Sequence, residues 1–248
     1  ALPPFITFVS LLGPIIGIAL GFDAVNAERS KGTLARLLAQ PVPRDTIINA
    51  KFVAGLLVVS VMMLFLGFLT IGMGIILIGI PPTAEEFFRI LLFIFVSIVY
   101  IGVWLNMAIM FSILFRQAAT SALSCLAVWL FFTLFFGMVV NLIVGATAPT
   151  EVTDVEQLLG YQGFVQNMLR LSPSQLFSEV TTTLLVPTVF TLGPITLEQA
   201  YGYVPGPLPL GQSVLLIWPQ LTGLVAAACV IFAIAYRAFM KQEIRSRS

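Results

Sequence analysis

The sequence predicts an all-α integral membrane protein, a polytopic bundle of transmembrane helices. Hydrophobic residues make up 59% of the 248 residues and charged residues only 9%, whereas about a quarter of a soluble domain is charged. Five apolar stretches, at 5–26, 49–80, 87–115, 119–146 and 211–238, reach the roughly 20 residues that a helix needs to cross the hydrocarbon core. None shows the alternating polarity of a transmembrane β-barrel, so all five are interpreted as helices.

The first stretch and the connection after it carry the main irregularities of the N-terminal part. Pro14 lacks a backbone N–H and is expected to bend its helix, which makes it a candidate hinge. The chain becomes polar after Gly21, and residues 27–44 form a charged segment that is interrupted by prolines. We expect Asp45 to cap the N-terminus of the helix that follows.

The second, third and fourth stretches are predicted to pack closely. Stretch 49–80 is longer than one bilayer needs and ends at two prolines, and Arg116 and Gln117 form a very short turn between the third stretch and the fourth. The third and fourth helices must therefore be antiparallel neighbours. Small residues allow close approach of helices in lipid, and we expect such packing at Gly67, Gly72, Gly74, Gly79 and the alanines and serines between residues 118 and 127.

Three regions follow from this pattern. Residues 1–146 hold the first four helices and the charged segment, and residues 147–210 form an extracytoplasmic loop with short helices near 155–170 and 175–185. Residues 211–248 form the last transmembrane helix and a basic tail, whose charge suits the anionic lipids of the inner leaflet.

Basic residues predict the orientation, because loops rich in Lys and Arg stay in the cytoplasm. With segment 27–44 inside, 10 of the 12 Lys and Arg residues are cytoplasmic, and Arg89 and Arg170 are the exceptions. The C-terminus is then cytoplasmic and Ala1 lies outside. Because Ala1 is not a methionine, we expect at least one further span before it, which gives at least six spans in all.

The composition argues against several kinds of chemistry. The chain has no histidine, which removes the commonest general base and metal ligand, and we expect no catalytic residue and no metal site. A net charge of +1 offers no surface for nucleic acid. The spans carry no ionisable group at membrane depth, and Asn106 and Asn141 are the strongly polar residues deep within them. Each either joins two helices by a hydrogen bond or lines a substrate path.

A family resemblance is carried by Glu28, Gly32, Thr33, Leu34, Leu37, Leu38, Ala39, Pro41, Val42 and Arg44, followed by Lys51. These residues resemble the permease subunit of type-2 ABC transporters, which are mostly exporters. Leu171, Ser172, Pro173 and Ser174 and the end of the chain give weaker matches. The outer Leu-Ser-Pro pattern favours the branch that is associated with maturation of nitrous oxide reductase.

The resemblance implies a non-catalytic subunit of a transporter in the cytoplasmic (inner) membrane. Its partners would be two copies of a P-loop ATPase, which bind ATP and Mg²⁺, a second permease copy and an extracytoplasmic protein. This chain itself has no P-loop and no cofactor. By resemblance, the coupling helix that docks the ATPase comprises Glu28, Arg29, Lys31, Gly32, Thr33, Leu34, Arg36, Leu37, Leu38, Pro41 and Arg44.

Three other functions stay open at this point. The chain could be a membrane scaffold or signalling subunit that joins a cytoplasmic partner to an extracytoplasmic one without transport. It could also be a channel or carrier that works without ATP, which the uncharged spans oppose. A membrane-embedded enzyme ranks last, because the sequence offers no catalytic arrangement.

Overall fold

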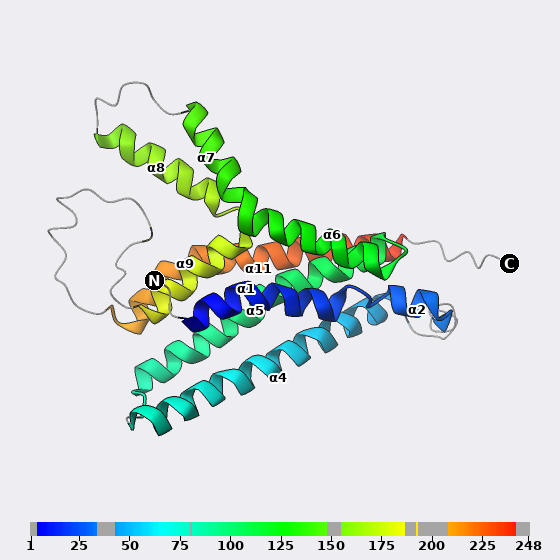
Figure 1. Cartoon of the computed structure of the whole chain (residues 1–248), viewed down its shortest axis with the longest axis horizontal. Coiled ribbons are helices and arrows are strands. Elements are labelled where there is room, and N and C mark those ends of the chain that lie inside the picture. Colours follow the sequence, from blue (N-terminus) through cyan, green and yellow to red (C-terminus); the bar gives the residue numbers. More distant parts are fainter. Residues whose placement is uncertain are drawn as a thin grey trace.

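The computed structural model describes residues 4–33, 43–79, 81–147, 155–186, 192 and 208–241, and these residues are helical apart from short connections (Figure 1). The helices are α1 (Pro4–Gly21), α2 (Asn26–Ser30), α4 (Arg44–Ile78), α5 (Ala84–Leu114), α6 (Ala118–Leu130), the π-helical segment η1 (Phe131–Phe135), α7 (Phe136–Thr147), α8 (Val155–Leu169), α9 (Pro173–Leu185) and α11 (Leu210–Met240). Five described segments are long and apolar enough to cross a membrane: 5–30, 44–77, 84–114, 118–147 and 210–240. The predicted all-α membrane fold is thus confirmed.

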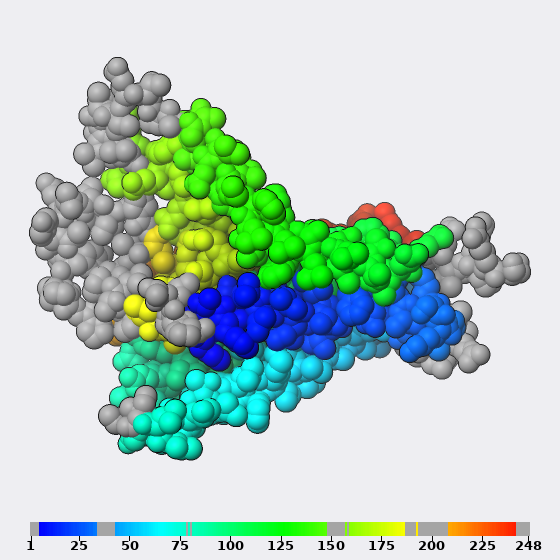
Figure 2. Space-filling model, viewed as in Figure 1, coloured from blue at the N-terminus to red at the C-terminus, as the bar shows by residue number. Residues whose placement is uncertain are grey.

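Helix α5 is the centre of the bundle. It packs against α1, α4, α6, α9 and α11, and 67% of its most apolar window is buried, against 17% for α4. Its fully buried side chains include Tyr100 and Trp104. Figure 2 shows α1 on one face of the molecule, between α4 and α6. The other spans therefore surround α5 and leave much of their own apolar surface exposed, as a lipid environment permits.

The two ends of the bundle differ in charge. One end holds α2, the turn between α5 and α6, and the C-terminal end of α11 (Figure 1). We call it the basic end, because Arg29, Lys51, Arg116, Arg237 and Lys241 lie in these segments or in the first turns of α4. An apolar cluster that includes Val25, Ile48, Ile113 and Phe239 joins the helices there. The α4–α5 connection and the start of α11 lie at the opposite end.

Helix α9 lies inside the bundle, although it belongs to the region that the sequence marks as a loop. It packs against α11, α5 and α1, and Phe177, Val180 and Leu184 on it are fully buried. Its N-terminal proline stands at a position that tolerates a missing N–H. Part of the predicted outer loop is thus a structural element of the helix bundle.

The fourth predicted span departs from the bundle along its length. Helix α6 buries one face through Ser121, Cys125 and Trp129, which lie four residues apart. The π-helical segment η1 then leads into α7, where Val140 is the buried residue. Helix α7 runs beside α8 (Figure 1), and the hydroxyl of Tyr161 in α8 donates a hydrogen bond to the carbonyl of Val144.

The expected packing of small residues is partly wrong. Of the four glycines named in the prediction, Gly67 contacts Ile94, but a side chain added at Gly72, Gly74 or Gly79 would meet no described residue within 4 Å. Gly79 instead ends α4 in the left-handed region, at φ +80°. Close approach to the backbone of a neighbouring helix lies elsewhere, between α1 and α5, where Cβ atoms at Gly17 and Gly21 would come within 2.9 Å of backbone carbonyl oxygens of α5.

The predicted cap of α4 is also wrong. Helix α4 begins at Arg44, Pro43 stands at its N-cap position without a side-chain hydrogen bond, and Asp45 lies in the first turn. There its charge still suits the positive end of the helix dipole. Helix α5 has the side-chain cap that α4 lacks, since Thr83 accepts from the N–H of Glu86 and the Glu86 carboxylate accepts from the N–H of Thr83.

Candidate functional site

The candidate docking segment begins with α2, and the structure describes it as far as Thr33. Glu28, Arg29, Lys31, Gly32 and Thr33 are described, and so is Arg44, the first residue of α4. Five predicted site residues lie outside the described residues: Leu34, Arg36, Leu37, Leu38 and Pro41. The site is therefore described through the two ends of the docking segment, the residues up to Thr33 and Arg44.

Ser112 of α5 holds the beginning of α2. Its hydroxyl oxygen accepts hydrogen bonds from the backbone N–H of Val25 at 3.0 Å and of Asn26 at 3.2 Å. The first N–H groups of a helix have no partner within the helix, and α2 has no side-chain cap of its own. A buried serine from another helix supplies the acceptor instead, which fixes α2 to the end of α5.

The turn between α5 and α6 is a second attachment point. The guanidinium of Arg29 donates from Nη1 to the carbonyl oxygen of Phe115 at 3.3 Å. With the amide orientation that matches its surroundings, buried Asn26 donates from its side-chain nitrogen to the same carbonyl at 2.8 Å. Phe115 directly follows the last residue of α5, so α2 and this turn are bound together.

An ion pair joins α2 to α4. Lys51 Nζ lies 2.6 Å from Glu28 Oε1, and both side chains are partly exposed. The other carboxylate oxygen, Glu28 Oε2, is buried without a hydrogen-bond partner among the described residues. The hydroxyl of Thr33 donates to the backbone carbonyl of Glu28. Glu28 thus anchors both the next span and the chain that leaves α2.

Gly32 changes the direction of the chain after α2. It has φ +68°, the left-handed region that disfavours side chains, and no described residue lies within 4 Å of an added Cβ. Lys31 and Gly32 are both exposed. The attached side of α2 therefore faces the bundle, while the residues at its C-terminal end are exposed.

The candidates for a hinge and a substrate path lie apart from this segment. Pro14 lies within α1. Asn106 is buried in α5, and its amide nitrogen donates to the carbonyl of Ala228 in α11 at 3.2 Å. Asn141 is exposed on α7. The structure therefore does not bring the two asparagines together.

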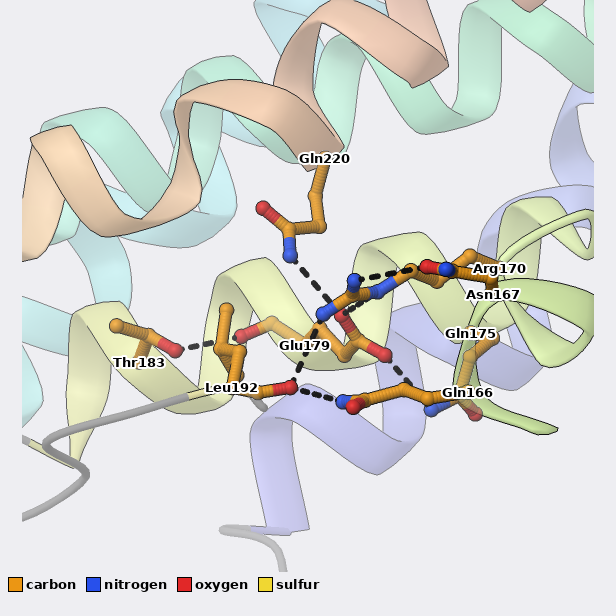
Figure 3. Close-up of polar contacts among 8 residues, drawn as sticks. All are labelled: Gln166, Asn167, Arg170, Gln175, Glu179, Thr183, Leu192 and Gln220. Carbon is orange, nitrogen blue, oxygen red and sulfur yellow. Dashed lines mark hydrogen bonds and ion pairs between the residues drawn. The ribbon is translucent and has the colours of Figure 1, made fainter. Parts of the chain in front are cut away.

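A buried polar network that we did not predict joins α9 to α11 (Figure 3). The Glu179 carboxylate accepts hydrogen bonds from Arg170 Nε at 2.9 Å, Gln220 Nε2 at 3.1 Å and Gln175 Nε2 at 3.2 Å. Glu179 and Gln220 are both buried. Arg170 also donates to the carbonyl of Leu192 at 3.0 Å. A buried carboxylate requires such partners, and here they come from α11 and from the region around α9.

Arg89 forms a second polar connection, at the end of the bundle opposite the basic end. The guanidinium of this buried residue contacts the carbonyls of Leu184 at 2.9 Å and Leu208 at 2.6 Å, and the Glu85 carboxylate at 2.8 Å. It also lies 3.3 Å from the hydroxyl of Ser213. Arg89 therefore ties the start of α5 to the end of α9 and the start of α11.

Among the described residues, no three His, Cys, Asp or Glu side chains gather in a way that could hold a metal ion. Of the three ion pairs among the described residues, Lys51–Glu28 joins α4 to α2, Arg170–Glu179 joins the residue after α8 to α9, and Arg89–Glu85 lies within α5.

Comparison with known proteins defines the class. A profile described as "ABC-2 family transporter protein" matches residues 4–244, and the chain belongs to this family, as the resemblance predicts.

Among individual proteins, the chain is similar to the probable ABC transporter permease protein NosY of Stutzerimonas stutzeri. The two are 27% identical over 171 residues, which is 64% of this chain and 62% of NosY. This similarity supports the NosY-like branch of the family. The chain thus spans less than two thirds of the length of this relative.

The residues that sequence reasoning missed are Ser112, Glu179 and Gln220. Serine and glutamine in apolar stretches are weak signals by themselves, since either often bonds within its own helix. Glu179 had no visible partner because the short helix predicted near 175–185 was placed in an extracytoplasmic loop and not inside the bundle. Arg170 did give a signal, since it is one of only two basic residues predicted to lie outside.

Proposed function

We propose that this chain is the membrane-spanning subunit of an ATP-driven transporter and that segment 27–44 docks a separate P-loop ATPase. In this proposal two permease copies work with two ATPase copies, which bind ATP and Mg²⁺. The basic end faces the cytoplasm, with the C-terminus, and the membrane is the cytoplasmic (inner) one. Family membership supports the transporter role, and the distribution of Lys and Arg supports the orientation.

The observation that carries the docking proposal is the way α2 is held. It is attached to α5 through Ser112, to the α5–α6 turn through Arg29, and to α4 through Glu28 and Lys51. Its exposed end at Gly32 has room for a partner. A force applied there would act on three spans at once. This is what a motor that moves transmembrane helices needs.

The test uses a matched pair of glycines. Gly32 and Gly79 both have positive φ and open space around an added Cβ, and they lie at opposite ends of the bundle. Gly32→Asp and Gly79→Asp therefore introduce the same charge and the same kind of backbone strain. Full-length protein is purified from its native membrane in mild detergent, and co-purifying proteins are identified by mass spectrometry.

We expect a P-loop ATPase with the wild type and with Gly79→Asp, and at least tenfold less of it with Gly32→Asp. Absence of an ATPase from the wild type, or its retention by Gly32→Asp, would contradict the docking proposal. A captured ATPase without any transport in vesicles would favour a scaffold or signalling subunit. Flux without ATP would favour a channel or carrier.

A further inference from the structure

Pro14 leaves one carbonyl group of α1 without its usual partner. In an α-helix the carbonyl of residue 10 accepts a hydrogen bond from the N–H of residue 14, and proline has no N–H. The Ser10 carbonyl therefore needs a donor from outside α1. That donor is Tyr100 of α5, whose hydroxyl lies 3.1 Å from the Ser10 oxygen.

The same hydroxyl contacts α9. It lies 3.2 Å from the hydroxyl oxygen of Ser174, a residue of the Leu-Ser-Pro-Ser sequence that contributes to the family resemblance. Because a carbonyl only accepts and a tyrosine hydroxyl has one proton, Tyr100 donates to Ser10, and Ser174 donates to Tyr100. The hydrogen bonds thus run in one direction, from α9 through α5 to α1.

The ring of Tyr100 cannot move independently of α9. It is fully buried and stacks on Phe177, with ring centroids 4.3 Å apart and planes 14° apart. Phe177 is three residues after Ser174, so both lie on one face of α9. Helix α9 therefore holds Tyr100 at the ring and at the hydroxyl.

We propose that Tyr100 is a positioning residue that transmits movement of α1 at the basic end to α9. The inference rests on the proposed function, because the movement starts where the ATPase would dock. At Pro14 the helix is free of one internal hydrogen bond, and Tyr100 makes the replacement bond. From α9 the connection continues to α11 through Glu179 and Gln220.

The first test concerns the connection itself and needs no ATPase. Tyr100→Phe keeps the stacked ring and removes the hydroxyl. We expect hydrogen–deuterium exchange two- to tenfold faster in residues 10–18 and 174–184, the factor that corresponds to one hydrogen bond. Tyr161→Phe is the control, because it removes a hydroxyl of α8 that donates to the backbone carbonyl of Val144 in α7. It should leave exchange in α1 unchanged.

A double variant distinguishes loss of the Tyr100–Ser10 hydrogen bond from a general loosening of the helix bundle. In Pro14→Ala the restored N–H can donate to Ser10, so the Tyr100 hydroxyl is no longer needed there. Adding Tyr100→Phe to Pro14→Ala should then change exchange in α1 by less than twofold, while α9 still exchanges faster. An equal effect of Tyr100→Phe in both backgrounds would overturn the proposal.

The second test concerns transmission and uses the complex with the captured ATPase. ATP and Mg²⁺ should change the exchange of α9 in the wild type, and this change should be at least halved in Tyr100→Phe with ATPase capture unchanged. An undiminished change would also overturn the proposal. If no ATPase is captured from the wild type, the proposed function fails, whereas the first test still decides whether Tyr100 joins α1 to α9.

Discussion

Replacing Gly17 with alanine should push α1 and α5 apart. The added Cβ would lie 2.8 Å from the carbonyl oxygen of Ile101 and 3.0 Å from the backbone nitrogen of Leu105, whereas ordinary contacts of such an atom are 3.4–4 Å. Both neighbours are backbone atoms of α5, the central helix, so neither can turn away as a side chain could. The helices must separate by roughly half an ångström to restore normal contact.

Overpacking of this kind costs about 1–3 kcal/mol. Against this, alanine is favoured over glycine inside a helix by about 1 kcal/mol. Gly72→Ala is the matched control, because it has the same change in propensity and nothing within 4 Å of the new Cβ. The difference between the two variants therefore isolates the packing cost, about 2 kcal/mol.

The melting temperature of Gly67→Ala should lie between those of Gly17→Ala and Gly72→Ala. Its Cβ would meet the end of the Ile94 side chain at 2.2 Å, and a flexible side chain can rotate to make room. Thermal unfolding is followed in one detergent by the fluorescence of the three tryptophans. We expect Gly17→Ala to melt roughly 4–8 °C below Gly72→Ala. Equal melting temperatures for these two variants would refute the assignment of Gly17 to a close α1–α5 contact.

Three further changes test the polar connections. Ser112→Ala removes the acceptor of two N–H groups at the start of α2, at a cost of about 1–3 kcal/mol. Hydrogen–deuterium exchange in residues 25–30 should be faster, and unchanged exchange would refute the role of Ser112 as the cap of α2. Glu179→Gln removes the charge that Arg170 contacts and should lower the melting temperature by roughly 3–10 °C; no decrease would mean that the network does not stabilise α9. Lys51→Met should cost less than about 1 kcal/mol, because its ion pair is partly exposed, yet reduce ATPase capture; a large loss of stability would contradict the expected weakness of the pair.

The number and placement of the spans could be predicted because apolar length alone decides them. The five described spans coincide with the apolar stretches, with ends that differ by a few residues. Helix ends were less predictable. Asp45 was expected to cap α4, but the helix already begins at Arg44, and the residue type at one position cannot fix where the first turn forms.

The position of α9 could not be predicted, because burial depends on neighbours. Its sequence contains Gln175, Glu179 and three consecutive threonines, which favour a polar loop by composition. In the structure Glu179 is buried because donors from α11 and from residues before α9 surround it. Its burial therefore depends on contacts between distant parts of the chain, which no local pattern reports.

One signal was present in the sequence and could have been used. Gly13, Gly17 and Gly21 recur every four residues, the spacing at which residues share a helix face. Pro14 likewise indicates that the Ser10 carbonyl lacks its helical hydrogen bond. It does not indicate that Tyr100 donates to this carbonyl. The candidate site was predicted from resemblance and not from geometry, and its central residues stay a prediction.

The π-helical segment at Phe131–Phe135 carries one residue more than an α-helical path of the same length would need. Its closing bond runs from the N–H of Phe136 to the carbonyl of Phe131, five residues back, instead of the usual four. Every side chain of α7 is consequently rotated by about 100° relative to a continuous α6. The buried face of α6 therefore cannot extend into α7, which packs on α8 instead. Deleting a single amino acid from this stretch would restore the phase and turn the hairpin of α7 and α8 to another side of the molecule.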